Sequence, residues 1–210
     1  MVAITGTALS LPLHRLPPAT HRAPAEQLLL IGQPRPIRVP ERRWRSWLDD
    51  SEVVARFTAK RYRRAEDQCW VWIGAVSSTG HGSFRAASLP GPTRRGTVPA
   101  HLFAYQLAHG VIPRLGWSST QDAVISHQCD FAGCTNPTHM RLGTNATNRF
   151  EYLTRRRNLA NPLADIRGAA GRTRAIAAAI RAGLANHESG ADIERRILET
   201  QNAGVPLTLW

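Results

Sequence analysis

Residues 125–148 read ISHQCDFAGCTNPTHMRLGTNATN, and the predicted fold is built around this segment. Cys129, Cys134 and His139 follow one another at intervals of five residues, in a loop with little apolar material. The remaining cysteine, Cys69, stands at the start of an upstream segment rich in β-forming residues. Three thiolates and one imidazole make a closed tetrahedral ligand set for Zn²⁺, without a position for a reactive water. We therefore expect these four residues to hold a structural zinc ion.

The alternative is that the cysteines pack as small apolar residues and that His139 is a surface residue at the start of a helix or strand. The C-x4-C-x4-H spacing, together with the use of every cysteine in the chain, favours zinc. Three cysteines are an odd number and do not make a disulfide framework, so a reducing compartment such as the cytoplasm is expected.

The charge of the chain indicates an anionic partner. Lys60 is the only lysine among 27 basic residues, and the formal net charge is +12. Arginine suits phosphate oxygens, so this balance is typical of nucleic-acid binding. The preference for arginine over lysine also fits a GC-rich genome, so the net charge, more than the arginine content, indicates an anionic partner. No apolar run approaches the roughly 18–20 residues that a membrane span needs, so no membrane partner is expected.

The pattern of apolar residues predicts an α+β fold. Residues 1–40 are rich in proline and arginine without a sustained period and are expected to be a basic flexible tail. One or two short helices are expected over 41–66, followed by a β-hairpin that joins 70–73 to 83–86. A short helix around 102–107 should end at Gly110.

The rest of the chain predicts a strand, a tight loop, a second strand and a helix, followed by two further helices. AVISHQC and the residues after His139 are the strands, and Thr144 is the expected N-cap of the helix. The C-terminal helices are expected over 172–184 and from Ser189 onward. They could form a helix-turn-helix-like DNA-reading element, or pack on the core, or form a dimer.

The segment 125–148 resembles the active-site segment of the HNH and His-Cys box homing endonucleases. CWVWIG, GHGSF and AHLFAYQLAHGVIP resemble parts of phage and bacterial HNH nucleases, so the resemblance covers about 41–157. It implies a small zinc-stapled ββα-metal core, also called a His-Me finger, with a preceding hairpin and flanking helices. Residues 41–157 would be the nuclease domain, between the tail 1–40 and a helical extension 158–210.

The resemblance also implies roles for single residues. His127, two residues before the first cysteine of the box, stands where the family has its general base. Asn148, 21 residues later, stands where the family has a ligand of the catalytic Mg²⁺, which Mn²⁺ can replace. Many members have an aspartate before the base, whereas this chain has Ser126. The His-Cys box enzymes lack that aspartate too, and hold one metal through an asparagine and DNA oxygens.

A phosphate in its transition state needs positive charge nearby, and the GPTRR loop offers Arg94 for this role. A solvated loop charge is the alternative reading of Arg94, and Arg85 is the second choice. Further DNA contacts are expected from the basic residues Arg85, Arg95, Arg155, Arg156 and Arg157. His101 and His109 are interpreted as packed or surface residues, and Asn136 as a cap or turn residue.

The predicted function is metal-dependent hydrolysis of phosphodiester bonds in double-stranded DNA, by a homing or phage-type HNH endonuclease, with 5′-phosphate and 3′-hydroxyl products. It would act in the cytoplasm, or in the host cytoplasm if it is a phage protein, and a homodimer is possible. One alternative is a catalytically silent, zinc-stabilised DNA-binding or regulatory protein. Another is an RNA nuclease or RNA-binding protein, which the basic charge would equally permit.

Overall fold

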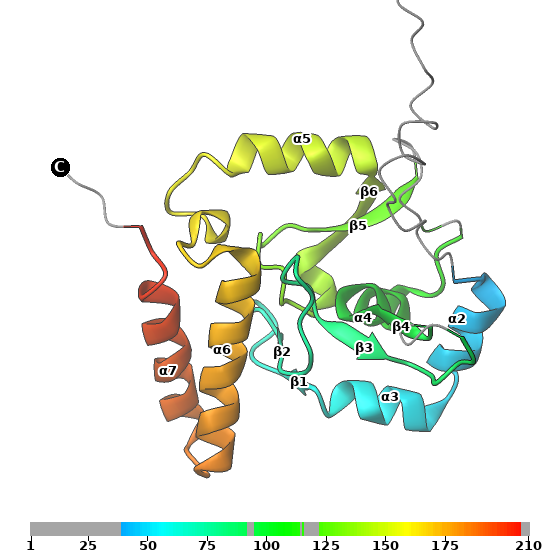
Figure 1. Cartoon of the computed structure of the whole chain (residues 1–210), viewed down its shortest axis with the longest axis horizontal. Helices are drawn as coiled ribbons and strands as arrows, with labels where there is room; N and C mark the ends of the chain where they lie inside the picture. Colours follow the sequence, from blue (N-terminus) through cyan, green and yellow to red (C-terminus); the bar gives the residue numbers. More distant parts are fainter. Residues whose placement is uncertain (1–38, 92–94, 114, 116–121, 207–210) are drawn as a thin grey trace, which may run out of the picture. The chain divides into compact units, whose positions relative to one another are not determined.

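The computed structural model describes residues 39–91, 95–113, 115 and 122–206 (Figure 1). All of them belong to one compact unit, Pro36–Trp210. The fold is α+β, as predicted, and its strands form three small two-stranded sheets. Nearly all of the tail expected over 1–40, and also Arg94, lie outside the described residues.

Two short helices open the described chain, in agreement with the prediction for 41–66. They are α2 (Glu41–Leu48) and α3 (Ser51–Thr58). The carboxylate of Asp50 accepts hydrogen bonds from the first backbone N–H groups of α3, which explains where this helix begins. Buried side chains on one face of each helix, Trp44 and Phe57 among them, enter the main hydrophobic core.

The predicted hairpin between 70–73 and 83–86 is wrong. Strand β2 (Val71–Trp72) pairs with β1 (Arg61–Tyr62), and β3 (Ser83–Arg85) pairs with β4 (Thr97–Pro99). The turn between β2 and β3 is closed within 75–83, where Ser83 N–H donates to the Ala75 carbonyl at 2.7 Å. Backbone pairing therefore does not continue along this turn as far as β2.

Helix α4 (Ala100–His109) follows β4 directly and ends at Gly110, the predicted stop. Gly110 has φ +86°, a left-handed conformation that glycine adopts without steric cost. The core beneath α4 is aromatic: Phe103 lies 4.7 Å from Phe57 and 4.8 Å from Phe84 between ring centroids. Trp72 stacks on Phe57 at 5.4 Å, and this places β2 against the same core.

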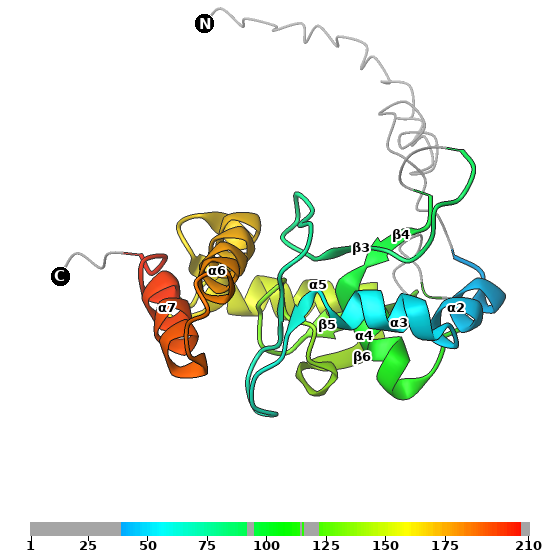
Figure 2. The same ribbon diagram turned by 90° about the horizontal axis from the view of Figure 1, so that it is seen from below.

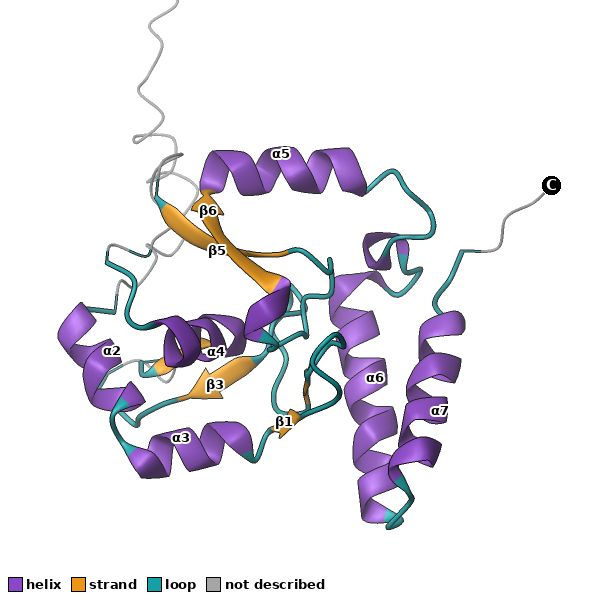
Figure 3. Cartoon of the chain, turned by 180° about the vertical axis from the view of Figure 1, so that it is seen from behind, coloured by secondary structure: helices purple, strands orange, loops and turns teal. Residues whose placement is uncertain are grey.

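Strand β5 (Ala123–His127) pairs antiparallel with β6 (Met140–Thr144), and α5 (Asn145–Arg155) follows β6 without a linker (Figure 3). Thr144 caps α5 as predicted, because its hydroxyl accepts from Thr147 N–H. The loop between the strands contains a short 3₁₀ helix, η1 (Pro137–His139). The order strand, loop, strand, helix predicted from the sequence is confirmed.

A second 3₁₀ helix, η2 (Pro162–Ala164), leads into two long helices, α6 (Gly168–Ala185) and α7 (Gly190–Asn202). The two lie side by side in both views (Figures 1 and 2). Isoleucines from both helices form a second hydrophobic cluster with residues of β2 and of the loop 128–139 between β5 and β6, which we call the cysteine loop. The members of this cluster are Val71, Phe131, Cys134, Ile176, Ile180, Ile193 and Ile197. The C-terminal helices thus pack on the segment that carries the cysteines.

Within the described part of the chain, every helix falls short of the length and apolar character that crossing a bilayer requires.

Ile180 tests whether this second cluster supports the whole unit. Its side chain is fully buried between α6, α7 and β2, so Ile180→Ala should lower the free energy of unfolding by about 2–5 kcal/mol. Leu184→Ala on the same helix, where the side chain is 44% exposed, should cost no more than about 1 kcal/mol. Urea unfolding of the zinc-loaded protein measures both, and equal losses would contradict the prediction.

Candidate metal centre and active site

Backbone pairing between distant segments brings Cys69 to the other two cysteines. Trp72 N–H donates to the Gly133 carbonyl at 2.9 Å, and Thr135 N–H donates to the Trp70 carbonyl at 2.7 Å. Between them, Val71 forms an antiparallel bridge with Cys134. The edge of β2 therefore binds the cysteine loop as a short strand would.

The four predicted zinc ligands lie together. The ligand atoms of Cys69, Cys129, Cys134 and His139 are all within 4.8 Å of one another. Nδ1 of His139 is 3.4 Å from Sγ of Cys69 and 3.8 Å from Sγ of Cys134. A tetrahedral zinc ion, with bonds of about 2.0–2.3 Å, separates its ligand atoms by roughly 3.5–3.8 Å. This Cys₃His cluster can hold a structural metal such as zinc.

The three sulfurs share negative charge unequally. Hydrogen bonds from the thiols of Cys134 and Cys69 hold the pKa of Cys129 far below its ordinary value. The same contacts with Cys129 raise the pKa of Cys69 and of Cys134. A single thiolate is thus favoured among the three thiols alone, and a divalent cation would supply the charge that lets all three ionise.

Asn136 holds the two segments of this cluster together. It is fully buried, and its side-chain NH₂ donates to the carbonyls of Glu66 and Gln68, each at 2.8 Å. Its side-chain oxygen accepts from Thr138 N–H at 3.1 Å and so caps η1, in agreement with the predicted cap. The long-range bonds to the segment before Cys69 were not foreseen, because no local pattern signals them.

His127 stands at the end of β5, where the adjoining loop orients its ring. Nε2 lies 3.1 Å from the carbonyl oxygen of Cys134. A carbonyl only accepts, so Nε2 carries the hydrogen, and in the neutral ring Nδ1 keeps a free lone pair. Burial lowers the pKa of His127, which favours this neutral form. The neutral ring of His127 can therefore accept a proton at Nδ1.

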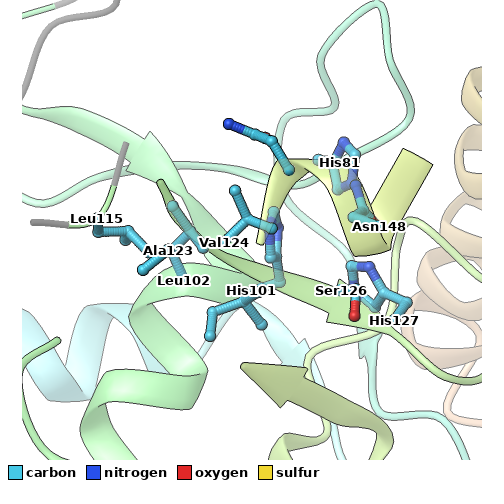
Figure 4. Close-up of a pocket in the computed structure, with 11 residues that line it drawn as sticks. His81, His101, Leu102, Leu115, Ala123, Val124, Ser126, His127 and Asn148 are labelled. Carbon is cyan, nitrogen blue, oxygen red and sulfur yellow. The ribbon is translucent and has the colours of Figure 1, made fainter. Parts of the chain in front are cut away.

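A pocket of about 100 Å³ lies between β5, α4 and the start of α5. His127, Ser126 and Asn148 line one end in the view of Figure 4, and Leu102, Leu115 and Ala123 line the other. Ser126 is buried, and its hydroxyl donates to the Arg141 carbonyl at 3.4 Å. Asn148 is exposed on the first turns of α5. His127 and Asn148 thus lie on one pocket, although 21 residues separate them.

Two further histidines line the same pocket. The ring centroids of His81 and His101 are 4.6 Å apart, and they lie 5.6 Å and 4.9 Å from that of His127. His101 is buried, in agreement with its interpretation as a packed residue, and its Nδ1 has no hydrogen-bond partner in the described chain. His81 was given no role from the sequence. An imidazole between two glycines in a turn was the only local signal available.

The basic residues predicted to contact DNA differ in how far other residues of the protein engage their guanidinium groups. Arg155 pairs with Asp130 at 3.1 Å and with Glu151 at 3.3 Å, so its guanidinium is engaged within the protein. Arg95 donates to the Pro90 carbonyl at 2.8 Å, and Arg156 lies over the Tyr152 ring. Exposed members of the set are Arg85, Arg95, Arg156 and Arg157. DNA contact by any of them remains a prediction.

Comparisons of the chain with protein-family models, with curated proteins and with solved structures each found no match. The function is therefore inferred from the chain's own residues.

His139 tests the metal centre. His139→Ala removes the one nitrogen ligand, so the purified protein should lose most of its zinc, measured by elemental analysis, and unfold at a lower temperature. His109→Ala is the matched control, since His109 is an exposed imidazole at the end of α4, away from the cysteines. Equal zinc content in wild type and His139→Ala would refute the Cys₃His site.

Proposed function

We propose that this protein is a metal-dependent endonuclease of the HNH, ββα-metal class that hydrolyses phosphodiester bonds of double-stranded DNA. The observation that carries the proposal is the placing of His127: its Nε2–H is held by the Cys134 carbonyl, and it shares a pocket with Asn148 from the following helix. A fixed base opposite an amide oxygen suits activation of water beside a metal ion.

The donor set of the pocket fits a weakly held Mg²⁺. Among the described residues that line it, Asn148 and Asn145 provide amide oxygens and Ser126 a hydroxyl, but none is a carboxylate. Mg²⁺ keeps several waters and often takes only one or two protein ligands together with substrate phosphate oxygens. Asn148 is the residue that would hold it. When bound, the ion would offset negative charge on the phosphate and on the leaving 3′ oxygen.

The protein's own groups would position and deprotonate the attacking water. Nδ1 of His127 accepts the proton, and the positive charge that forms on the ring is stabilised by the hydrogen bond from Nε2–H to the Cys134 carbonyl. Asn136, together with a metal bound by the Cys₃His cluster, would hold that carbonyl in place, because Cys134 belongs to the cysteine loop. The structural metal would thus support the base without contacting substrate.

The net charge of +12 supports a nucleic-acid substrate of either kind. Among nucleic acids we favour double-stranded DNA because of the resemblance of residues 125–148 to the HNH nucleases. Phosphate contacts from exposed arginines would position a duplex without reading its sequence.

Replacement of the base gives the direct test. His127→Gln keeps a side-chain N–H that can donate to Cys134 but has no basic nitrogen, so cleavage should fall by roughly 10²- to 10⁴-fold with zinc content unchanged. Nicking of supercoiled plasmid, with and without added Mg²⁺, measures it, and His109→Ala serves as the control that keeps activity. DNA binding without cleavage by the wild type would favour the silent DNA-binding alternative, and cleavage of RNA alone would favour the RNA nuclease.

Asn148 provides a second test, directed at the catalytic metal. Asn148→Ala should reduce cleavage by at least roughly 10- to 100-fold. Removal of groups that merely support a metal ligand already costs this much. It should also raise the Mg²⁺ concentration required for half-maximal rate, because an amide oxygen ligand is gone. Asn186→Ala is the matched control on the exposed end of α6. An unchanged Mg²⁺ titration for Asn148→Ala would contradict the assignment.

A further inference from the structure

The turn that carries His81 is held in one place by α6. Arg174 of α6 donates to the Ser77 carbonyl at 3.3 Å, and Arg181 donates to the Ile73 carbonyl at 2.8 Å. Gly80 lies against the start of α6, where a Cβ would be 2.7 Å from the carbonyl of Ala169. These contacts, all made to residues that precede His81, hold the turn and with it the position of His81 in the pocket.

Two hydroxyl groups orient the ring of His81. Its Nδ1 is 3.0 Å from Oγ1 of Thr79, which is 2.9 Å from Oγ of Ser77. If the Thr79 hydroxyl donates to Nδ1, the hydrogen of the neutral ring is on Nε2. The other tautomer would leave Nε2 unprotonated, and it could not bind a phosphate oxygen because both atoms would then present only lone pairs. The Nε2–H form is the one that can donate to a phosphate.

The pocket lacks a cation in the part of the chain that the structure describes. Its lining residues include three histidines, two asparagines and one serine but neither arginine nor lysine. A phosphodiester gains negative charge as water adds to phosphorus, so a fixed hydrogen-bond donor is needed beside the phosphate oxygens. Two imidazoles flank the base: the ring of His101, with its centroid 4.9 Å away, is buried, whereas the ring of His81, 5.6 Å away, is only half-buried and is the one open to a substrate.

A groove beside the pocket offers a path for a nucleic-acid strand. It is lined largely by hydroxyl-bearing residues of the turn and of β3 and β4, and it shares His81 and His101 with the pocket. These hydroxyl residues are Ser77, Ser78, Thr79, Ser83 and Thr97. A strand in this groove would pass His81 before its phosphate reaches His127.

We propose that His81 is a further catalytic residue, whose Nε2–H donates to a non-bridging oxygen of the scissile phosphate and is held in this tautomer by Thr79. The proposal rests on the nuclease function proposed above. Burial, with a smaller contribution from His127, lowers the pKa of His81 to about 4. The ring is therefore neutral at neutral pH and acts as an N–H donor, and no proton leaves it during the reaction.

Single-turnover cleavage of a duplex, with rate and DNA affinity measured separately, tests this role. His81→Ala should slow the chemical step by roughly 10²- to 10³-fold, as loss of one transition-state donor does, and leave DNA affinity and zinc content unchanged. His81→Gln, which restores an N–H donor, should recover part of the rate. Thr79→Val should slow the step roughly 10-fold, in line with losing a group that orients a functional side chain, whereas Thr79→Ser should not.

A phosphorothioate at the scissile phosphate separates contact from a merely structural role. Sulfur in place of the oxygen that His81 contacts should slow the wild type more than it slows His81→Ala, because the variant has already lost that hydrogen bond. Equal sulfur effects in both, or a wild-type rate for His81→Ala, would overturn the proposal while leaving the nuclease function standing. Absence of cleavage by the wild type would overturn both.

Discussion

Pairing between the edge of β2 and the cysteine loop is the interaction on which the other features depend. The loop between β5 and β6 contributes few apolar side chains of its own, and Phe131 is its one large buried apolar residue. Hydrogen bonds between Trp70, Trp72, Gly133 and Thr135 fix its backbone and bring Cys69 beside Cys134. The Cys₃His cluster forms only because this pairing exists, and a bound metal would in turn make the pairing harder to open.

The same loop determines the state of His127. The carbonyl that receives its Nε2–H belongs to Cys134, one of the four clustered residues. A shift of the loop would release the ring from its tautomer and from its direction into the pocket. In the proposed nuclease the cluster would only orient His127, so a closed ligand set with no position for water would be compatible with a neighbouring reactive site.

Elements that depend on local signals could be predicted from the sequence, and those that depend on distant pairing could not. Gly110 ends α4 and Thr144 caps α5 for reasons contained within one helical turn. The spacing of Cys129, Cys134 and His139 is also local, so the ligand set could be predicted too. By contrast, β2 binds β1 on one edge and the cysteine loop on the other, and its few residues do not specify either partner. The turn that carries His81 is held at the pocket by contacts with α6, about 90 residues later in the chain. The residues around His81 therefore could not predict its position.

The distribution of charge separates two tasks. The chain is strongly basic, yet the imidazoles of the pocket are neutral, since burial lowers the pKa of His81, His101 and His127 alike. Exposed arginines would attract a polyanion at long range, whereas each further positive charge beside His127, added to that of the proposed Mg²⁺, would lower the basicity of its ring. Neutral N–H donors avoid that conflict, because they stabilise a phosphate oxygen at short range without lowering the basicity of the neighbouring ring as strongly as a full charge would. A basic surface around an uncharged histidine pocket is therefore consistent with binding phosphate and deprotonating water in the same place.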